Sequence, residues 1–148
     1  MPTVITSVRL GSCTRSEVWP ILVDFVGYPA FMADVLAVRI DSHDADRLVS
    51  TWKVLLNGSE LTWTETDRLV AEQRIEFQQL DGDLEVWHGT WALVDRDDGL
   101  HVDLEVTFDL GIPSLAEVLH PIGERAIRAN SKQMLEGIRD RLLLARAV

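Results

Sequence analysis

The stretch LHVDLEVTFDL, residues 100–110, decides the fold class of this chain. Apolar and polar side chains alternate at every position, which is the period of a β-strand, because successive side chains of a strand point to opposite faces. One face is wholly apolar, and the other is polar or charged: His101, Asp103, Glu105, Thr107 and Asp109. The stretch therefore predicts an antiparallel sheet with one buried face and one solvated face.

Further alternating runs lie upstream, and short clusters of turn residues separate them. Asn57-Gly58 is the clearest of these turns, because both central positions of a type I′ turn need positive φ. The sequence predicts seven consecutive strands. They span residues 3–10, about 35–42, 48–56, 60–68, 71–80, 84–95 and 100–110.

Helices are expected after the first strand and after the last one. Residues 14–17, Thr-Arg-Ser-Glu, form a capping box that begins a helix, which tolerates Pro20 in its first turns. Residues 27–32 predict a break and a second short helix. Another capping box begins a long amphipathic helix over 114–144, with a kink expected near Pro121. The predicted fold class is α+β, a curved seven-stranded antiparallel sheet around the C-terminal helix, with two short helices between strands 1 and 2.

Length and composition fit one globular domain, spanning residues 1–148. The net charge of −10 argues against nucleic-acid binding and against an anionic membrane surface, since both need a basic protein surface. We find neither a membrane-spanning run nor a signal peptide, so the expected location is cytoplasmic. A lone cysteine, Cys13, excludes an internal disulfide and a cysteine-rich zinc site. The sequence has no metal-binding or nucleotide-binding motif, so we expect no metal and no cofactor.

The order of several short motifs resembles the START-like (SRPBCC, helix-grip) superfamily, close to its polyketide cyclase/dehydrase branch. These motifs are Ser16-Glu17-Val18-Trp19, Tyr28-Pro29-Ala30-Phe31, the pair Trp52 and Trp63, Gly89-Thr90-Trp91, and Ser131-Lys132-Gln133-Met134-Leu135. The resemblance implies a cavity between the concave sheet face and the long helix, which holds an apolar or aromatic ligand. It does not imply one chemistry, since the fold hosts cyclases, lipid carriers and quinone-binding proteins.

Strand phase places four of the five tryptophans on the inward face: Trp52, Trp63, Trp87 and Trp91. A buried tryptophan needs a partner for its indole N–H, which a cavity with a ligand or water would supply. The alternative is that these rings only fill a wide core. Further candidate ligand-binding residues are Phe77, Phe108, Tyr28, Phe31, Met134 and Asn130.

Two carboxylates, Glu65 and Asp67, share the inward phase of Trp63. A buried carboxylate is costly unless its pKa shifts, it pairs, or it contacts a ligand. Glu65 is the candidate general acid–base, although a bulge that exposes it to water is a nearly equal alternative. We expect Asp67 to reach water at the strand end. Arg68, in the opposite phase, is the second catalytic candidate, as a partner for either carboxylate.

Aromatase members of the superfamily carry an arginine in this strand, and alignment on Trp63 puts that position at Asp67. This departure favours Glu65 as the acid–base group. The resemblance implies a polyketide cyclase/aromatase-like protein; the alternatives are a non-catalytic lipid or quinone carrier and an interaction module. An acyl carrier protein is a possible partner. Its docking surface would be the cationic stripe of the long helix: Arg125, Arg128, Lys132 and Arg139.

Overall fold

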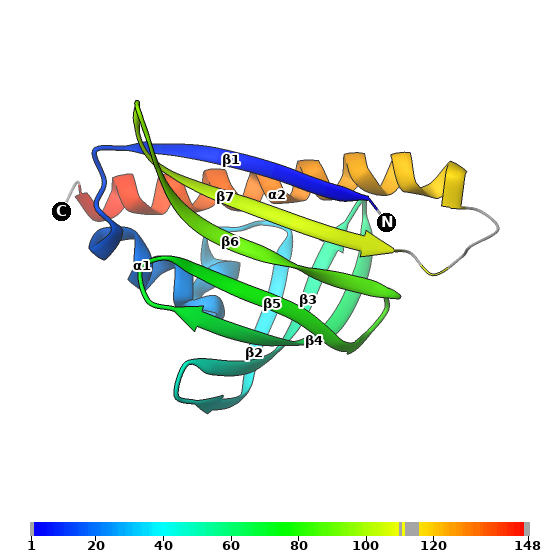
Figure 1. Cartoon of the computed structure of the whole chain (residues 1–148). Helices are drawn as coiled ribbons and strands as arrows, with labels where there is room; N and C mark the ends of the chain where they lie inside the picture. The colour runs from blue at the N-terminus through cyan, green and yellow to red at the C-terminus, as the bar shows by residue number, and fades with distance from the viewer. Residues whose placement is uncertain (1, 110, 112–115, 147–148) are drawn as a thin grey trace.

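Seven antiparallel strands and one long helix make up most of the molecule (Figure 1). The structure is a computed structural model that describes residues 2–109, 111 and 116–146, without the side chains of 116–120. The strands are β1 (Thr3–Gly11), β2 (Val35–Asp44), β3 (Arg47–Leu56), β4 (Ser59–Val70), β5 (Arg74–Gly82), β6 (Val86–Arg96) and β7 (Gly99–Asp109). The helices are α1 (Arg15–Val23), the short 3₁₀ helix η1 (Phe25–Ala30) and α2 (Ala116–Arg146).

The sheet has the order β1-β7-β6-β5-β4-β3-β2, so the first strand pairs with the last and the others follow as a meander. The α+β class, the seven strands and the two short helices between β1 and β2 are confirmed. One boundary is wrong, because residues 71–73 form a turn rather than the start of a strand. Glu72 takes a left-handed φ of 58° there, although no Gly, Pro or Asn marks the position.

The first capping box forms as predicted. The backbone N–H of Thr14 donates to Glu17 Oε1 over 3.0 Å, and the backbone N–H of Glu17 donates to Thr14 Oγ1. Arg146, at the end of α2, contacts the same carboxylate at 2.9 Å, so the two helices are joined at this corner. The second predicted capping box, at residues 114–117, lies outside the described residues. No described helix is long and apolar enough to cross a bilayer.

Helix α2 runs along β1 over the concave face of the sheet (Figure 1). Its buried stripe of Ile127, Leu135, Ile138 and Leu142 packs there with the inward residues of the sheet. The alternation in residues 100–108 is confirmed, because every even-numbered residue from Leu100 to Phe108 is buried, whereas the odd-numbered residues between them are half-buried or exposed.

Gly89 is a point of close approach in the sheet. It pairs with Phe77 of β5 and Val106 of β7, and a Cβ atom added to it would collide with the carbonyl oxygen of Glu105. The same atom would lie 2.8 Å from Cζ of Phe77. Any side chain here would have to displace the backbone of β7 and the ring of Phe77.

We therefore expect Gly89→Ala to lower the free energy of unfolding by about 3 kcal/mol, the upper part of the range for an overpacked core. Urea unfolding followed by circular dichroism measures this. Gly58→Ala is the matched control, since an added Cβ there meets nothing within 4 Å and only the positive φ of 80° opposes it. Equal losses in the two variants would contradict the close packing at Gly89.

Candidate functional site

A cavity lies between the concave sheet face and α2, where strand phase placed the tryptophans. Five aromatic rings form its sheet wall: Trp52, Trp63, Phe77, Trp87 and Trp91. Val54, Leu104, Val106 and Met134 add apolar surface, and three polar residues complete the lining: Glu65, Asn130 and Ser131. The volume is about 30 Å³, which is room for one or two water molecules.

The aromatic wall is a continuous set of ring contacts that extends across the middle strands. Trp52 and Trp63 are cross-strand partners, with parallel rings 6.1 Å apart between centroids. Trp63 contacts Trp87 at 5.0 Å, and Trp87 contacts Phe77 at 6.3 Å. Such tilted and offset pairs stabilise each other beyond the area they bury. The wall is therefore rigid and offers flat apolar surface.

Glu65 lies on this wall and is 3% exposed. The indole N–H of Trp63 donates to Glu65 Oε1 over 2.7 Å. The carboxyl is the one ionisable group among the lining residues of the cavity, so the chemistry available there is that of a carboxyl. The pairing of β4 with β5 shifts register between Thr64 and Glu65, but the extra residue is Leu80 of β5, which is exposed, and Glu65 stays buried.

Asp67 is fully buried, so the expectation that it reaches water is wrong. The hydroxyl of Ser50 donates to Asp67 Oδ2 over 2.5 Å, and the indole N–H of Trp52 donates to Ser50 Oγ over 2.8 Å. The other oxygen, Oδ1, is buried and receives no fixed donor from the described residues. Because β4 stays paired with β3 past this point, the inward phase continues to Asp67.

Burial raises the pKa of both carboxyls. For Glu65 the pKa lies well above its usual range, first because of burial and then because of the hydrogen bond and charge of Asp67; the bond from Trp63 opposes this. For Asp67 burial also raises the pKa, while hydrogen bonds with Glu65 and Ser50 lower it. The pair therefore holds a proton at pH values where an exposed carboxyl has lost it.

Seven of the ten predicted ligand-binding residues line the cavity, and three do not. Tyr28 is fully buried behind Trp52 and Trp91, and its hydroxyl donates to the carbonyl of Leu22. Phe31 is half-buried, and the guanidinium of Arg141 lies over its ring, 5.8 Å from the centroid. Phe108 is fully buried as the cross-strand partner of Trp87. These three rings pack around the residues that line the cavity but do not reach the cavity themselves.

Arg68 lies on the outer face of the sheet, and the prediction that it partners Glu65 or Asp67 is wrong. Its guanidinium lies 3.3 Å from Glu76 and 3.9 Å from Asp46, and its side chain is 45% exposed. Successive side chains of a strand point to opposite faces, and Arg68 lies one residue after Asp67 and three after Glu65, so its side chain points away from both.

Sequence reasoning missed two buried serines at the site. Ser50 precedes Trp52 by two residues and therefore shares its inward phase, which was a usable signal. Ser131 lines the cavity beside Asn130, whose side-chain Nδ2 has no hydrogen-bond partner among the described residues. The described part of the chain holds no cluster of three or more residues suited to a metal ion.

A family model described as polyketide cyclase / dehydrase and lipid transport matches residues 12–135. The chain belongs to this family. No curated protein matches the chain in sequence.

Solved structures share the whole fold. The protein TTHA0849 from Thermus thermophilus has a TM-score of 0.87 and 23% identity, with 97% of this chain and 99% of that chain covered. An aromatase/cyclase, Zhui, from Streptomyces sp. R1128 has a TM-score of 0.80 and 18% identity, with 95% and 93% covered. A START superfamily protein from Mycobacterium smegmatis has a TM-score of 0.75 and 17% identity, with 97% and 98% covered. The predicted helix-grip fold is confirmed.

The raised pKa values predict how stability depends on pH. Between the unfolded pKa of a carboxyl and its raised folded pKa, the folded state binds more protons, so stability falls as pH rises. We expect the free energy of unfolding to decrease as pH rises above 4.5, the ordinary pKa of a glutamate side chain. In Glu65→Gln, the decrease should be clearly smaller.

Urea unfolding at a series of pH values measures this slope. Glu60→Gln, on the exposed part of the same strand, is the matched control and should keep the parent slope. A slope that Glu65→Gln leaves unchanged would mean that Glu65 titrates as an exposed carboxyl.

Proposed function

We propose that this chain binds an apolar or aromatic small molecule in the cavity and promotes the aldol cyclisation and dehydration of a polyketide. One observation carries the proposal: a buried carboxyl with a raised pKa, Glu65, lies on a wall of aromatic rings. A group of this kind can act as an acid or as a base near neutral pH. The family and the aromatase/cyclase fold support the same function.

In the proposed cyclisation, an enol carbon of the bound chain forms a bond to a ketone carbon. The ketone oxygen takes the proton of Glu65, and the enol hydroxyl, which becomes a ketone, returns a proton to Glu65. In dehydration, Glu65 protonates the new hydroxyl, which leaves as water, and then recovers the proton released when the adjacent C–H bond breaks. The aromatic wall selects one folded conformation of the chain, and orientation of this kind supplies several kcal/mol of the barrier.

A ligand of this class needs more room than the cavity has. Sites for small molecules usually enclose about 300–1,000 Å³, against about 30 Å³ here. We propose that binding moves α2 away from the aromatic wall and displaces Met134, whose unbranched side chain adapts readily to a new shape.

A second candidate function is a non-catalytic carrier of a lipid or quinone. Its support is the apolar character of the wall, where Glu65 is the one ionisable group. The family description includes lipid transport, and a START superfamily protein shares the fold. A carrier needs the aromatic wall but not the proton of Glu65, and this difference separates the two functions.

We expect Glu65→Gln to lower the rate of cyclisation at least about 100-fold, because the amide cannot transfer the proton. Binding of a non-reactive aromatic ketone should weaken by less than about tenfold, since the wall is unchanged. Product analysis and calorimetric titration measure the two quantities. Turnover at the parent rate in this variant would support the carrier.

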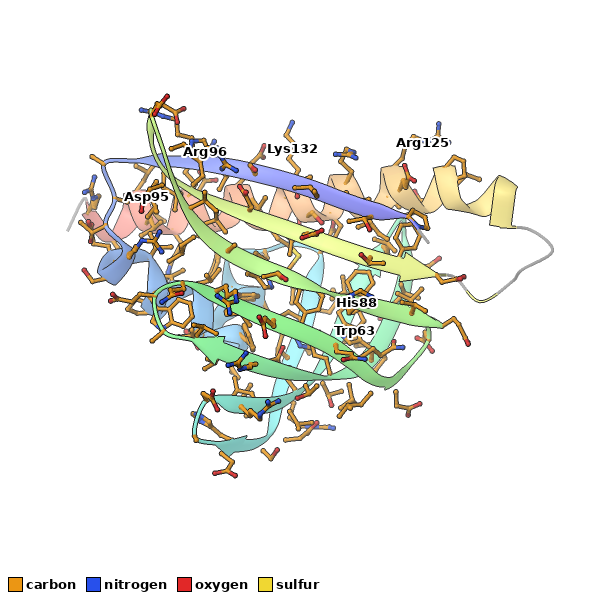
Figure 2. All side chains as sticks on the ribbon, viewed as in Figure 1. Trp63, His88, Asp95, Arg96, Arg125 and Lys132 are labelled. Carbon is orange, nitrogen blue, oxygen red and sulfur yellow. The ribbon has the colours of Figure 1, made fainter. Side chains whose placement is uncertain are left out.

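Delivery of the substrate by an acyl carrier protein would need a basic docking surface on this acidic chain. The cationic stripe offers one, and Figure 2 shows Arg125 and Lys132 projecting outward from α2. Arg128 lies at the edge of β1, where it donates to the carbonyl of Ile5 over 3.2 Å. Charge complementarity at such a surface mainly raises the association rate.

We expect the double reversal Arg128→Glu and Lys132→Glu to reduce turnover of carrier-bound substrate about tenfold or more at low salt. Turnover of the free substrate should not change. The control is Arg39→Glu, an exposed position on the opposite edge strand, β2. Unchanged turnover of the carrier-bound substrate would mean that the stripe is ordinary surface.

A further inference from the structure

We propose that Asp67 is a positioning residue that shares one proton with Glu65, so that Glu65 faces the cavity as an acid and the site prefers a neutral carbonyl compound to a carboxylate. The inference rests on the proposed binding of a ligand in the cavity. It extends that function by stating which chemical class of ligand the polar end of the site accepts.

The hydrogen bonds of the two carboxyls leave one buried oxygen, Asp67 Oδ1, without a donor among the described residues. Each carboxyl has one oxygen that accepts a fixed hydrogen bond, from Trp63 to Glu65 Oε1 and from Ser50 to Asp67 Oδ2. The two side chains lie two residues apart on the inward, buried face of β4, and neither carboxyl can donate to the other unless one of them holds a proton. A proton on Glu65 satisfies Asp67 Oδ1.

Each carboxyl accepts one fixed hydrogen bond, so burial and the neighbouring charge decide which of the two holds the proton. Asp67 accepts a hydrogen bond from the hydroxyl of Ser50, and the indole N–H of Trp52 donates to the oxygen of that hydroxyl and so orients it. Hydrogen bonds to a carboxylate favour its charged form. Burial and the neighbouring negative charge raise the pKa of Glu65. Asp67 is thus the carboxylate, and Glu65 is the acid.

No cation neutralises the pair within the described residues. Neither carboxyl forms an ion pair with any residue that the structure describes, and the arginine next to them, Arg68, lies on the outer face. From η1, Tyr28 stays neutral, because burial and then the negative charge of Asp67 hold its pKa well above the ordinary value. From α2, the nearby lining residues are the uncharged Asn130 and Ser131. One proton and one negative charge therefore remain on the pair at neutral pH.

This charge state has a consequence for the ligand. A ketone or quinone oxygen can accept an N–H of Asn130 Nδ2, which has no partner among the described residues. It accepts the single O–H of Glu65 as well when that hydrogen turns from Asp67 Oδ1 to the ligand. A carboxylate ligand would enter a poorly solvated site that already holds the negative charge of Asp67, and like charges repel strongly where water is excluded.

Two ligands of similar size test the preference: 1-tetralone, which is a neutral ketone, and 1-naphthoate, which is anionic at pH 7. In calorimetric titrations, the parent protein should bind 1-tetralone at least about tenfold more tightly than 1-naphthoate. Asp67→Asn removes the charge and should tighten 1-naphthoate about tenfold. Glu65→Gln keeps the charge of Asp67, so it should weaken 1-tetralone and still exclude 1-naphthoate. Circular dichroism of each variant checks that it folds.

Infrared spectroscopy of the ligand-free protein tests the shared proton directly. The parent should show the C=O stretching band of a protonated carboxylic acid at pH 7, and Glu65→Gln should lack it. In Asp67→Asn the band should titrate at lower pH, because the neighbouring negative charge is gone. If the parent lacks the band, or if Asp67→Asn excludes 1-naphthoate as the parent does, the inference is wrong.

Neither measurement depends on turnover, so a failure of cyclisation alone would leave the inference standing. Failure of both ligands to bind would instead reject the proposed cavity function.

Discussion

The structure depends on a single constraint: one helix must cover the concave face of a seven-stranded sheet. A sheet with one apolar face has to bury it against another layer. Helix α2 lies along β1, where Ile127 and Leu135 are buried, and it packs less closely on the middle strands. Large rings on those strands, with Trp52, Trp63 and Trp87 among them, fill most of the remaining space. The cavity is what these rings leave open.

The buried carboxyls are costly for folding, and this cost marks the site. A core selected for stability alone would hold apolar residues at positions 65 and 67, because desolvating a carboxyl is not fully offset by hydrogen bonds. Here two indole donors and the hydroxyl of Ser50 hold the pair in one geometry. Local choices that oppose stability are expected where a protein performs its function. The same argument explains why Asn130, on the opposite wall, keeps a side-chain Nδ2 that has no hydrogen-bond partner among the described residues.

The elements that depend on local signals could be predicted, and those that depend on contacts between distant residues could not. The alternation in residues 100–108 and the capping box at Thr14 are local, and both are confirmed. Asp67 was expected in water, because its burial depends on how far β3 stays paired with β4. Which rings reach the cavity surface depends on sheet curvature, so Phe108 could not be separated from its cross-strand partner Trp87 by phase alone. The turn at Glu72 contains no Gly, Pro or Asn, so the sequence does not predict it.

A crystal structure of the protein with bound 1-tetralone would test the central claim most directly. The account predicts that the ring lies on the aromatic wall beside Trp63, that α2 has moved to admit it, and that the ketone oxygen accepts a hydrogen bond from Glu65. A ligand found only on the outer surface, or one inside the cavity with its oxygen turned away from Glu65, would contradict it.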